Sequence, residues 1–101
     1  MINVIASIRI RTGRIPDFLK IFKDNMIKVR KEKGCIEYLP TVDIHAELPA
    51  QILDENVVTI IEKWENVEAL RDHLVSAHML AYREKVKEMV EGVALKILKE
   101  A

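Results

Sequence analysis

The sequence has few of the residues that cross-link a chain or reverse it sharply. Its 101 residues include one cysteine, three glycines and three prolines. The single cysteine, Cys35, excludes an intrachain disulfide and argues against a disulfide-stabilised secreted scaffold. No apolar run approaches the length of about 20 residues that spans a bilayer, and the first residues lack the basic start of a signal peptide. We therefore expect one globular domain over residues 1–101, located in the cytoplasm, with no membrane partner.

Neither sign of charge is in excess. Sixteen lysines and arginines balance sixteen aspartates and glutamates, and the two signs are interspersed along the chain. Domains that bind nucleic acid usually concentrate basic residues on one face, so we expect no nucleic-acid partner. Glycine-rich phosphate loops and a nucleophile elbow are also missing. Any catalysis should therefore use an apolar pocket with a few polar groups, or a cofactor without a sequence signature.

What the chain does contain is clear periodicity. Residues 2–11 alternate between apolar side chains and a more polar set, which predicts a strand. Further patterns predict a first helix and three more strands. They also predict a second helix that begins after Asn66, breaks, and restarts at Ser76. Asn66 and Ser76 are both suitable N-cap residues. The predicted ranges are 16–33 for the first helix, 35–44, 57–65 and 93–98 for the strands, and 76–91 for the restarted helix. This order, β-α-β-β-α-β, predicts an α+β fold of the ferredoxin-like, split βαβ type.

The predicted sheet has more apolar surface than its helices can cover. Helices of this topology cover one face only, yet the first, third and fourth strands carry apolar residues on both faces. We therefore expect a homodimer in which two sheets pack face to face. Residues 46–56 show no period and predict a loop, either a flap over a pocket or a plain connection.

Candidate functional residues concentrate between Val57 and Leu80. This stretch holds the only tryptophan, Trp64, and two of the three histidines. Glu62 shares a strand face with Trp64, and a carboxyl group there must be paired, protonated or exposed. An ion pair with a nearby lysine or arginine and a role in a binding site are both compatible with the pattern. Trp64 either fills the core or forms an aromatic wall for a flat ligand.

The remaining candidates are histidines and tyrosines. His73 lies at the margin of an apolar helix stripe, so it is either a pocket acid or base or an ordinary surface imidazole. His78 lies five residues later, which is not the spacing of a helical metal pair, and we expect no metal site. Tyr38 and Tyr82 both fall on inward faces, where a hydroxyl group could orient a ligand.

Three segments also resemble a known family. EKGCIEYLPTVD (Glu32–Asp43), VVTIIEKWENVEALRDHL (Val57–Leu74) and SAHMLAYREKVKEMV (Ser76–Val90) are similar to the antibiotic biosynthesis monooxygenases, most of all to the bacterial quinol monooxygenase branch. The specific elements are the Gly-Cys-x-x-Tyr step, the Glu-x-Trp strand end and the His-Leu-x-x-x-His pair around the helix break.

The resemblance implies a dimeric ferredoxin-like α/β barrel with one pocket per subunit. Members of this branch oxidise electron-rich dihydroxyarenes with molecular oxygen and use neither metal nor flavin. The implied partners are thus a small aromatic substrate, molecular oxygen and a second copy of the chain. Two alternatives stay open, namely a non-catalytic dimeric domain that binds a small aromatic and an isomerase of a small phosphorylated metabolite.

Carried onto this chain, the resemblance suggests a role for each candidate residue. His73 becomes the catalytic base, Trp64 the wall against the substrate ring and Glu62 a catalytic polar group. The substrate-binding candidates are Tyr38, His78, Tyr82 and Arg83.

Overall fold

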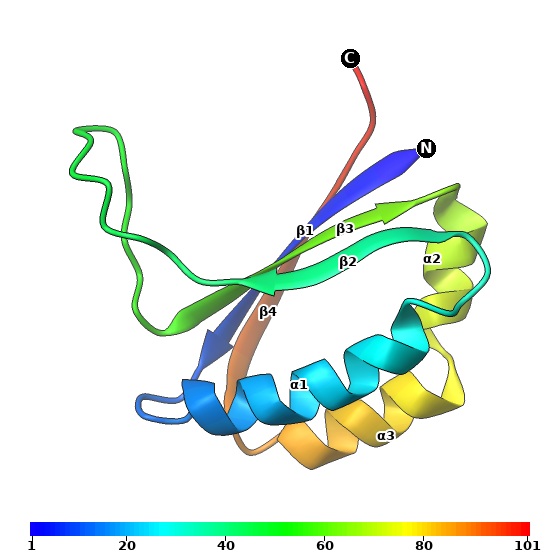
Figure 1. Ribbon diagram of the computed structural model, residues 1–101, viewed down its shortest axis with the longest axis horizontal. Coiled ribbons are helices and arrows are strands. Elements are labelled where there is room, and N and C mark those ends of the chain that lie inside the picture. The colour runs from blue at the N-terminus through cyan, green and yellow to red at the C-terminus, as the bar shows by residue number, and fades with distance from the viewer.

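The computed structural model describes all 101 residues and contains one antiparallel sheet with three helices (Figure 1). The sheet order is β2-β3-β1-β4, which confirms the ferredoxin-like fold that the periodicity predicts. The elements are β1 (Ile2–Ile10), α1 (Ile15–Val29), β2 (Cys35–Thr41), β3 (Val57–Trp64), α2 (Val67–Leu74), α3 (Ala77–Val86) and β4 (Val90–Leu98).

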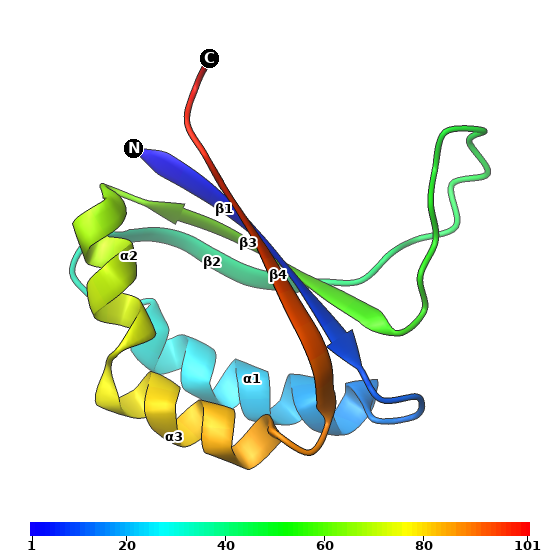
Figure 2. The ribbon, with the colours of Figure 1, turned by 180° about the vertical axis from the view of Figure 1, so that it is seen from behind.

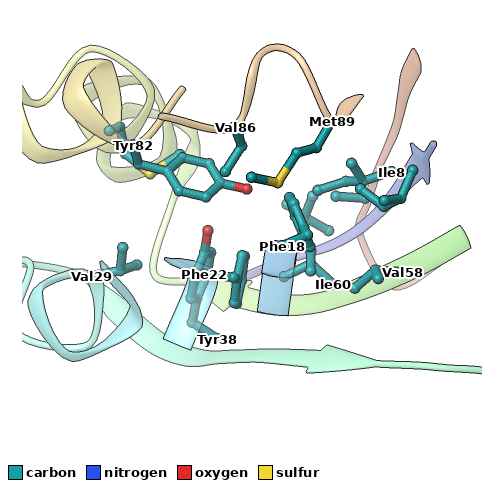
Figure 3. Close-up of a cluster of buried hydrophobic side chains, with 14 of the residues drawn as sticks. Ile8, Phe18, Phe22, Val29, Tyr38, Val58, Ile60, Tyr82, Val86 and Met89 are labelled. Atoms are coloured by element: carbon teal, nitrogen blue, oxygen red, sulfur yellow. The ribbon is translucent and has the colours of Figure 1, made fainter. Parts of the chain in front are cut away.

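The core lies between the sheet and the helices. Alternate residues of β1, from Val4 to Ile10, are at most 8% exposed because they point toward the helices. In β3 the buried set is Val58, Ile60, Glu62 and Trp64. Phe18 and Phe22 of α1 pack onto this face, and the Phe22 ring stacks on Tyr38 of β2 at 5.3 Å between centroids (Figure 3).

All three helices lie on one side of the sheet, as the views from front and back show (Figures 1 and 2). The other face carries Ile5, Leu39, Ile61 and Leu98, and the last three are 36–43% exposed. One chain therefore forms an open sheet, and a closed barrel would need a second chain.

Four predicted boundaries were wrong by three residues or more. The first helix ends at Val29 rather than at residue 33, because the next amides bond to carbonyls three residues back and tighten the chain into turns. Strand β2 ends at Thr41 rather than at residue 44. Strand β4 begins at Val90 rather than at residue 93, since the Arg11 amide already pairs with the Met89 carbonyl. The restarted helix, α3, correspondingly ends at Val86 rather than at residue 91, and Gly92 lies inside a strand and does not end a helix.

Both predicted helix caps are present. The Asn66 side chain accepts a hydrogen bond from the Ala69 amide at 2.9 Å, and Ser76 accepts one from the Met79 amide at 3.4 Å. The connection 42–56 contains no helix or strand and extends away from the helices (Figure 1). It does not line the main cavity of its own chain. No helix is long and apolar enough to cross a membrane.

Candidate active site

The main cavity lies between the sheet and α3 and has a volume of about 470 Å³. Eleven of its fifteen lining residues are hydrophobic, so the few polar groups decide what it binds. These groups are the hydroxyls of Tyr38 and Tyr82, the Glu62 carboxyl, the His73 imidazole, and the exposed Arg83 and Lys87.

Glu62 is a buried carboxyl group without a cationic partner. It is 6% exposed, and none of the ion pairs in the structure involves it, so the predicted alternative of a pairing with lysine or arginine was wrong. The indole N–H of Trp64 instead donates to its Oε1 at 2.9 Å. Burial raises the pKa of Glu62 to about 7, against the opposing effect of this hydrogen bond. The group therefore titrates near neutrality.

His73 is buried on the inner face of α2. Leu70 and His73 are the buried residues of this helix, three positions apart, and the imidazole lies 4.7 Å from the Trp64 ring and 5.3 Å from the Tyr38 ring between centroids. Its Nδ1 lies 2.8 Å from Oε2 of Glu32. Burial lowers the pKa of His73, partly offset by the Glu32 carboxylate, so the imidazole is neutral at pH 7.

The second nitrogen of His73 is accessible and belongs to a side chain that lines the cavity. Nε2 has no partner in the protein, and no fully buried side-chain nitrogen or oxygen in the structure lacks one. Nε2 must therefore contact accessible space, and His73 lines the cavity. A neutral imidazole with a free nitrogen toward an apolar cavity is suited to accept a proton from a bound ligand.

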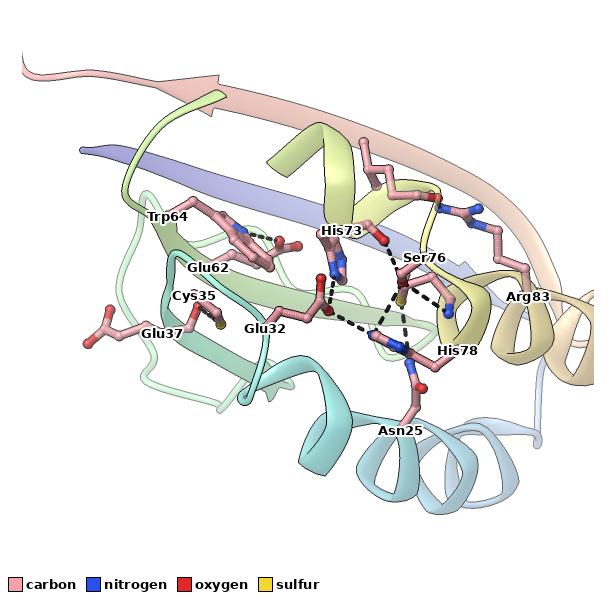
Figure 4. Close-up of polar contacts among 12 residues, drawn as sticks. Asn25, Glu32, Cys35, Glu37, Glu62, Trp64, His73, Ser76, His78 and Arg83 are labelled. Atoms are coloured by element: carbon pink, nitrogen blue, oxygen red, sulfur yellow. Dashed lines mark hydrogen bonds and ion pairs between the residues drawn. The ribbon is translucent and has the colours of Figure 1, made fainter. Parts of the chain in front are cut away.

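Trp64 does not line this cavity. It is fully buried, packs against His73 and hydrogen-bonds Glu62 (Figure 4). The structure therefore places Trp64 behind the two candidate acid–base groups, where it can position them but cannot stack on a ligand as the resemblance implies.

His78 lies outside the cavity as well. Its Nε2 is 2.9 Å from the same Oε2 of Glu32 that binds His73, and the two imidazoles meet this oxygen from different helices (Figure 4). Glu32 was not among the predicted site residues, because it lies near the end of the predicted first helix among basic residues. One signal was available, since Glu32 is the only acid in the run Arg30-Lys31-Glu32-Lys33.

Gly34 brings Glu32 close to His73. Its φ of +84° is strained for other residues, and a Cβ added there would lie 2.6 Å from the Cβ of Ala69 in α2. The turn that carries Glu32 therefore packs directly against the helix that carries His73. The Glu65 amide fixes the contact by donating to the Gly34 carbonyl at 2.9 Å.

Tyr38 and Tyr82 point their hydroxyl groups into the same region (Figure 3). Burial raises the pKa of both phenols, so both stay protonated at neutral pH and can donate hydrogen bonds. Arg83 lies at the exposed rim, where its guanidinium donates to the Leu74 carbonyl at 2.6 Å.

Cys35 begins β2, and its thiol is free and half-buried. Burial raises the pKa of the Cys35 thiol to about 11. No group of three or more His, Cys, Asp or Glu side chains could hold a metal ion.

Fold and site together define a class of protein. It is a small ferredoxin-like α+β domain whose apolar cavity joins a neutral imidazole, a carboxyl group that titrates near neutrality and two phenols. The sequence profile of the family described as "Antibiotic biosynthesis monooxygenase" matches residues 1–85. The chain belongs to this family, which confirms the resemblance and makes the protein a monooxygenase.

Individual relatives agree with this assignment. The chain is 38% identical to the "Probable quinol monooxygenase YgiN" of Escherichia coli K12, over 97% of this chain and 96% of the relative. Among solved structures, a conserved protein from Methanosarcina mazei superposes with a TM-score of 0.84 at 20% identity, over 99% of this chain and 92% of that one. Rv0793 from Mycobacterium tuberculosis gives 0.80 at 24% identity, over 99% and 94%. These two structures support the fold alone.

Proposed function

We propose that this protein oxidises a quinol or a similar electron-rich polyphenol with molecular oxygen, without a resident metal or flavin. The proposal depends chiefly on the buried imidazole of His73, which lines an apolar cavity and whose Nε2 has no partner in the protein. The identity to a relative named a quinol monooxygenase supports the substrate class.

The proposed reaction starts with proton transfer. Nε2 of His73 accepts a phenolic proton, and the resulting quinolate is electron-rich enough to pass electrons to oxygen directly. In balance, one quinol and one O₂ give one hydroxyquinone and one water. One oxygen atom enters the ring in place of hydrogen, while the other leaves as water. The quinol supplies all four electrons, so no other reductant is needed.

The surrounding groups suit this chemistry. The apolar lining excludes water, which strengthens hydrogen bonds to a developing negative charge. Protonated Tyr38 and Tyr82 can donate to a quinolate or to reduced oxygen. Glu62, with a pKa of about 7, can donate when protonated or act as a second base when ionised.

A dimer is part of this proposal. The sheet face without helices exposes Leu39, Ile61 and Leu98, one from each of three strands. A second sheet is the simplest cover for such a face, and together the two sheets would form the barrel that the resemblance implies. We expect light scattering to give twice the mass of one chain, and Ile61→Glu to give the monomer. A monomeric wild-type protein would contradict this part.

Isotope labelling tests the reaction. Metal-stripped, flavin-free protein is given menadiol and ¹⁸O₂, with an enzyme-free autoxidation blank. We expect O₂ uptake above the blank and one ¹⁸O atom in each hydroxylated product. If the product is instead unlabelled quinone with stoichiometric hydrogen peroxide, the protein is an oxidase and the proposed monooxygenase reaction is wrong. Tight menadiol binding without turnover would favour the binding-domain alternative, and no binding would favour the isomerase.

A further inference from the structure

One oxygen of Glu32 accepts from two histidines. Oε2 lies 2.8 Å from Nδ1 of His73 in α2 and 2.9 Å from Nε2 of His78 in α3 (Figure 4). The Glu32 side chain is only 13% exposed, which limits competition from water for these contacts. A single carboxylate in the turn after α1 therefore contacts both later helices, α2 through His73 and α3 through His78.

These contacts determine the tautomer of each imidazole. A carboxylate oxygen only accepts, so Nδ1 of His73 and Nε2 of His78 must both carry hydrogen. Ser76 adds a second constraint, because its hydroxyl proton goes to the His73 carbonyl at 2.8 Å. Its oxygen, 3.2 Å from Nε2 of His78, is then left to accept from that nitrogen. Neutral His73 is thus held with its Nε2 lone pair free toward the cavity.

We propose that Glu32 is the positioning residue of the cavity base and that His78 tunes that base by competing for the same carboxylate oxygen. Glu32 holds His73 with Nδ1 protonated, orients Nε2 toward the ligand and stabilises the imidazolium that forms on proton uptake. The catalytic consequence depends on the proposed function, whereas the tautomer and the competition do not.

Removal of Glu32 and removal of His78 should shift the pKa of His73 in opposite directions. The Glu32 carboxylate raises the pKa of His73, whereas His78 lowers it. Loss of Glu32 should therefore lower that pKa further, and loss of His78 should raise it. Other titratable or charged groups also surround the two imidazoles. Those that line the cavity with His73 are Tyr38, Glu62, Tyr82, Arg83 and Lys87. Those that share a second surface pocket with His78 are Asp24, Lys28, Tyr82 and Lys85.

The test is a histidine titration by ¹H–¹⁵N NMR on the full chain, which has only three histidines. In the wild-type protein we expect His73 with Nδ1 protonated and Nε2 bare. Glu32→Gln should lower the pKa of His73 and mix its tautomers, and His78→Leu should raise that pKa. Matched controls are Glu37→Gln, an exposed acid five residues away, and His45→Gln in the exposed connection. Neither control should change the pKa or the tautomer of His73.

Activity adds a second readout. Glu32→Gln should reduce kcat for menadiol oxidation about tenfold or more, and move the acid limb of kcat/KM to lower pH. A wild-type His73 protonated on Nε2 would overturn the proposal, as would shifts of the same sign in both variants. The wild-type protein and the variants could all lack oxygen uptake and still show the expected His73 tautomer and opposite pKa shifts. That result would contradict the proposed reaction and leave the positioning role of Glu32 supported.

Discussion

Two glutamates near His73 occupy opposite surroundings. Glu62 lies in the apolar cavity with one indole N–H as its partner, and burial raises its pKa to about 7. Glu32 meets two imidazole N–H groups on one oxygen at the edge of the helix layer. The same residue type is therefore a buried carboxyl group with a raised pKa in one region and an acceptor for two histidines in the other. Its partners, more than its residue type, determine its chemistry.

Removing the imidazole between the two regions should have the largest effect. His73→Ala deletes the proposed base and leaves Glu32 with one partner. We expect menadiol-dependent oxygen uptake to fall by about 10²- to 10⁴-fold, the usual contribution of a general base. His45→Ala, in the exposed connection, is the control and should keep wild-type activity. Wild-type activity in His73→Ala would move the role of base to Glu62.

Gly34→Ala should disrupt the Glu32 region alone. The new Cβ would meet Ala69 at 2.6 Å, at a residue whose φ is +84°. Backbone strain and overpacking together should lower the free energy of unfolding by about 2–4 kcal/mol in urea denaturation. Gly13→Ala is a matched control, because φ there is also positive but no atom lies within 4 Å of the added Cβ. Equal losses in the two variants would show that strain alone accounts for the effect.

Glu62→Gln should remove a pH dependence of the free energy of unfolding that arises from the carboxyl group in the cavity. The unfolded carboxyl group ionises near pH 4.5, and the folded group only near pH 7. A raised pKa stabilises the fold fully below pH 4.5, and this contribution is lost as pH rises to 7. The loss is about 3 kcal/mol in the free energy of unfolding. We expect Glu62→Gln to flatten that decline in urea titrations at pH 4.5 to 8. An unchanged slope would exclude Glu62 as its source.

The sequence predicted the fold because its signals are local. Alternation identified β1 and β3, and side-chain caps marked the starts of α2 and α3 at Asn66 and Ser76. The wrong element boundaries have a physical cause as well, namely hydrogen bonds between residues outside the local pattern. Helix α1 ends early because its last carbonyls close turns, and β4 starts early because Met89 pairs with Arg11 across the sheet. Nothing in a local pattern reports those bonds.

The candidate site was predictable only in part. Glu62 and His73 were singled out correctly as cavity residues, since each is polar at a position that the pattern buries. Glu32 was missed because its contact with His73 spans 41 positions, and it depends on Gly34 approaching Ala69. The family resemblance assigned His78 to the pocket, but after the helix break its imidazole lies against Glu32 and does not line the cavity.

Trp64→Phe should have the smallest effect of these variants. It should change the surroundings of Glu62 and leave those of Glu32 unchanged. Phenylalanine retains an aromatic ring behind His73 but lacks the N–H that donates to Glu62 at 2.9 Å. That hydrogen bond lowers the pKa of Glu62, so its loss should raise this pKa further above 7. The unpaired carboxyl should lower the free energy of unfolding by about 1–2 kcal/mol. Carboxyl ¹³C NMR measures the pKa, and His73 should keep its tautomer because Glu32 still holds Nδ1. A changed His73 tautomer would mean that the two regions are one coupled network, and the separate roles of the two glutamates would then fail.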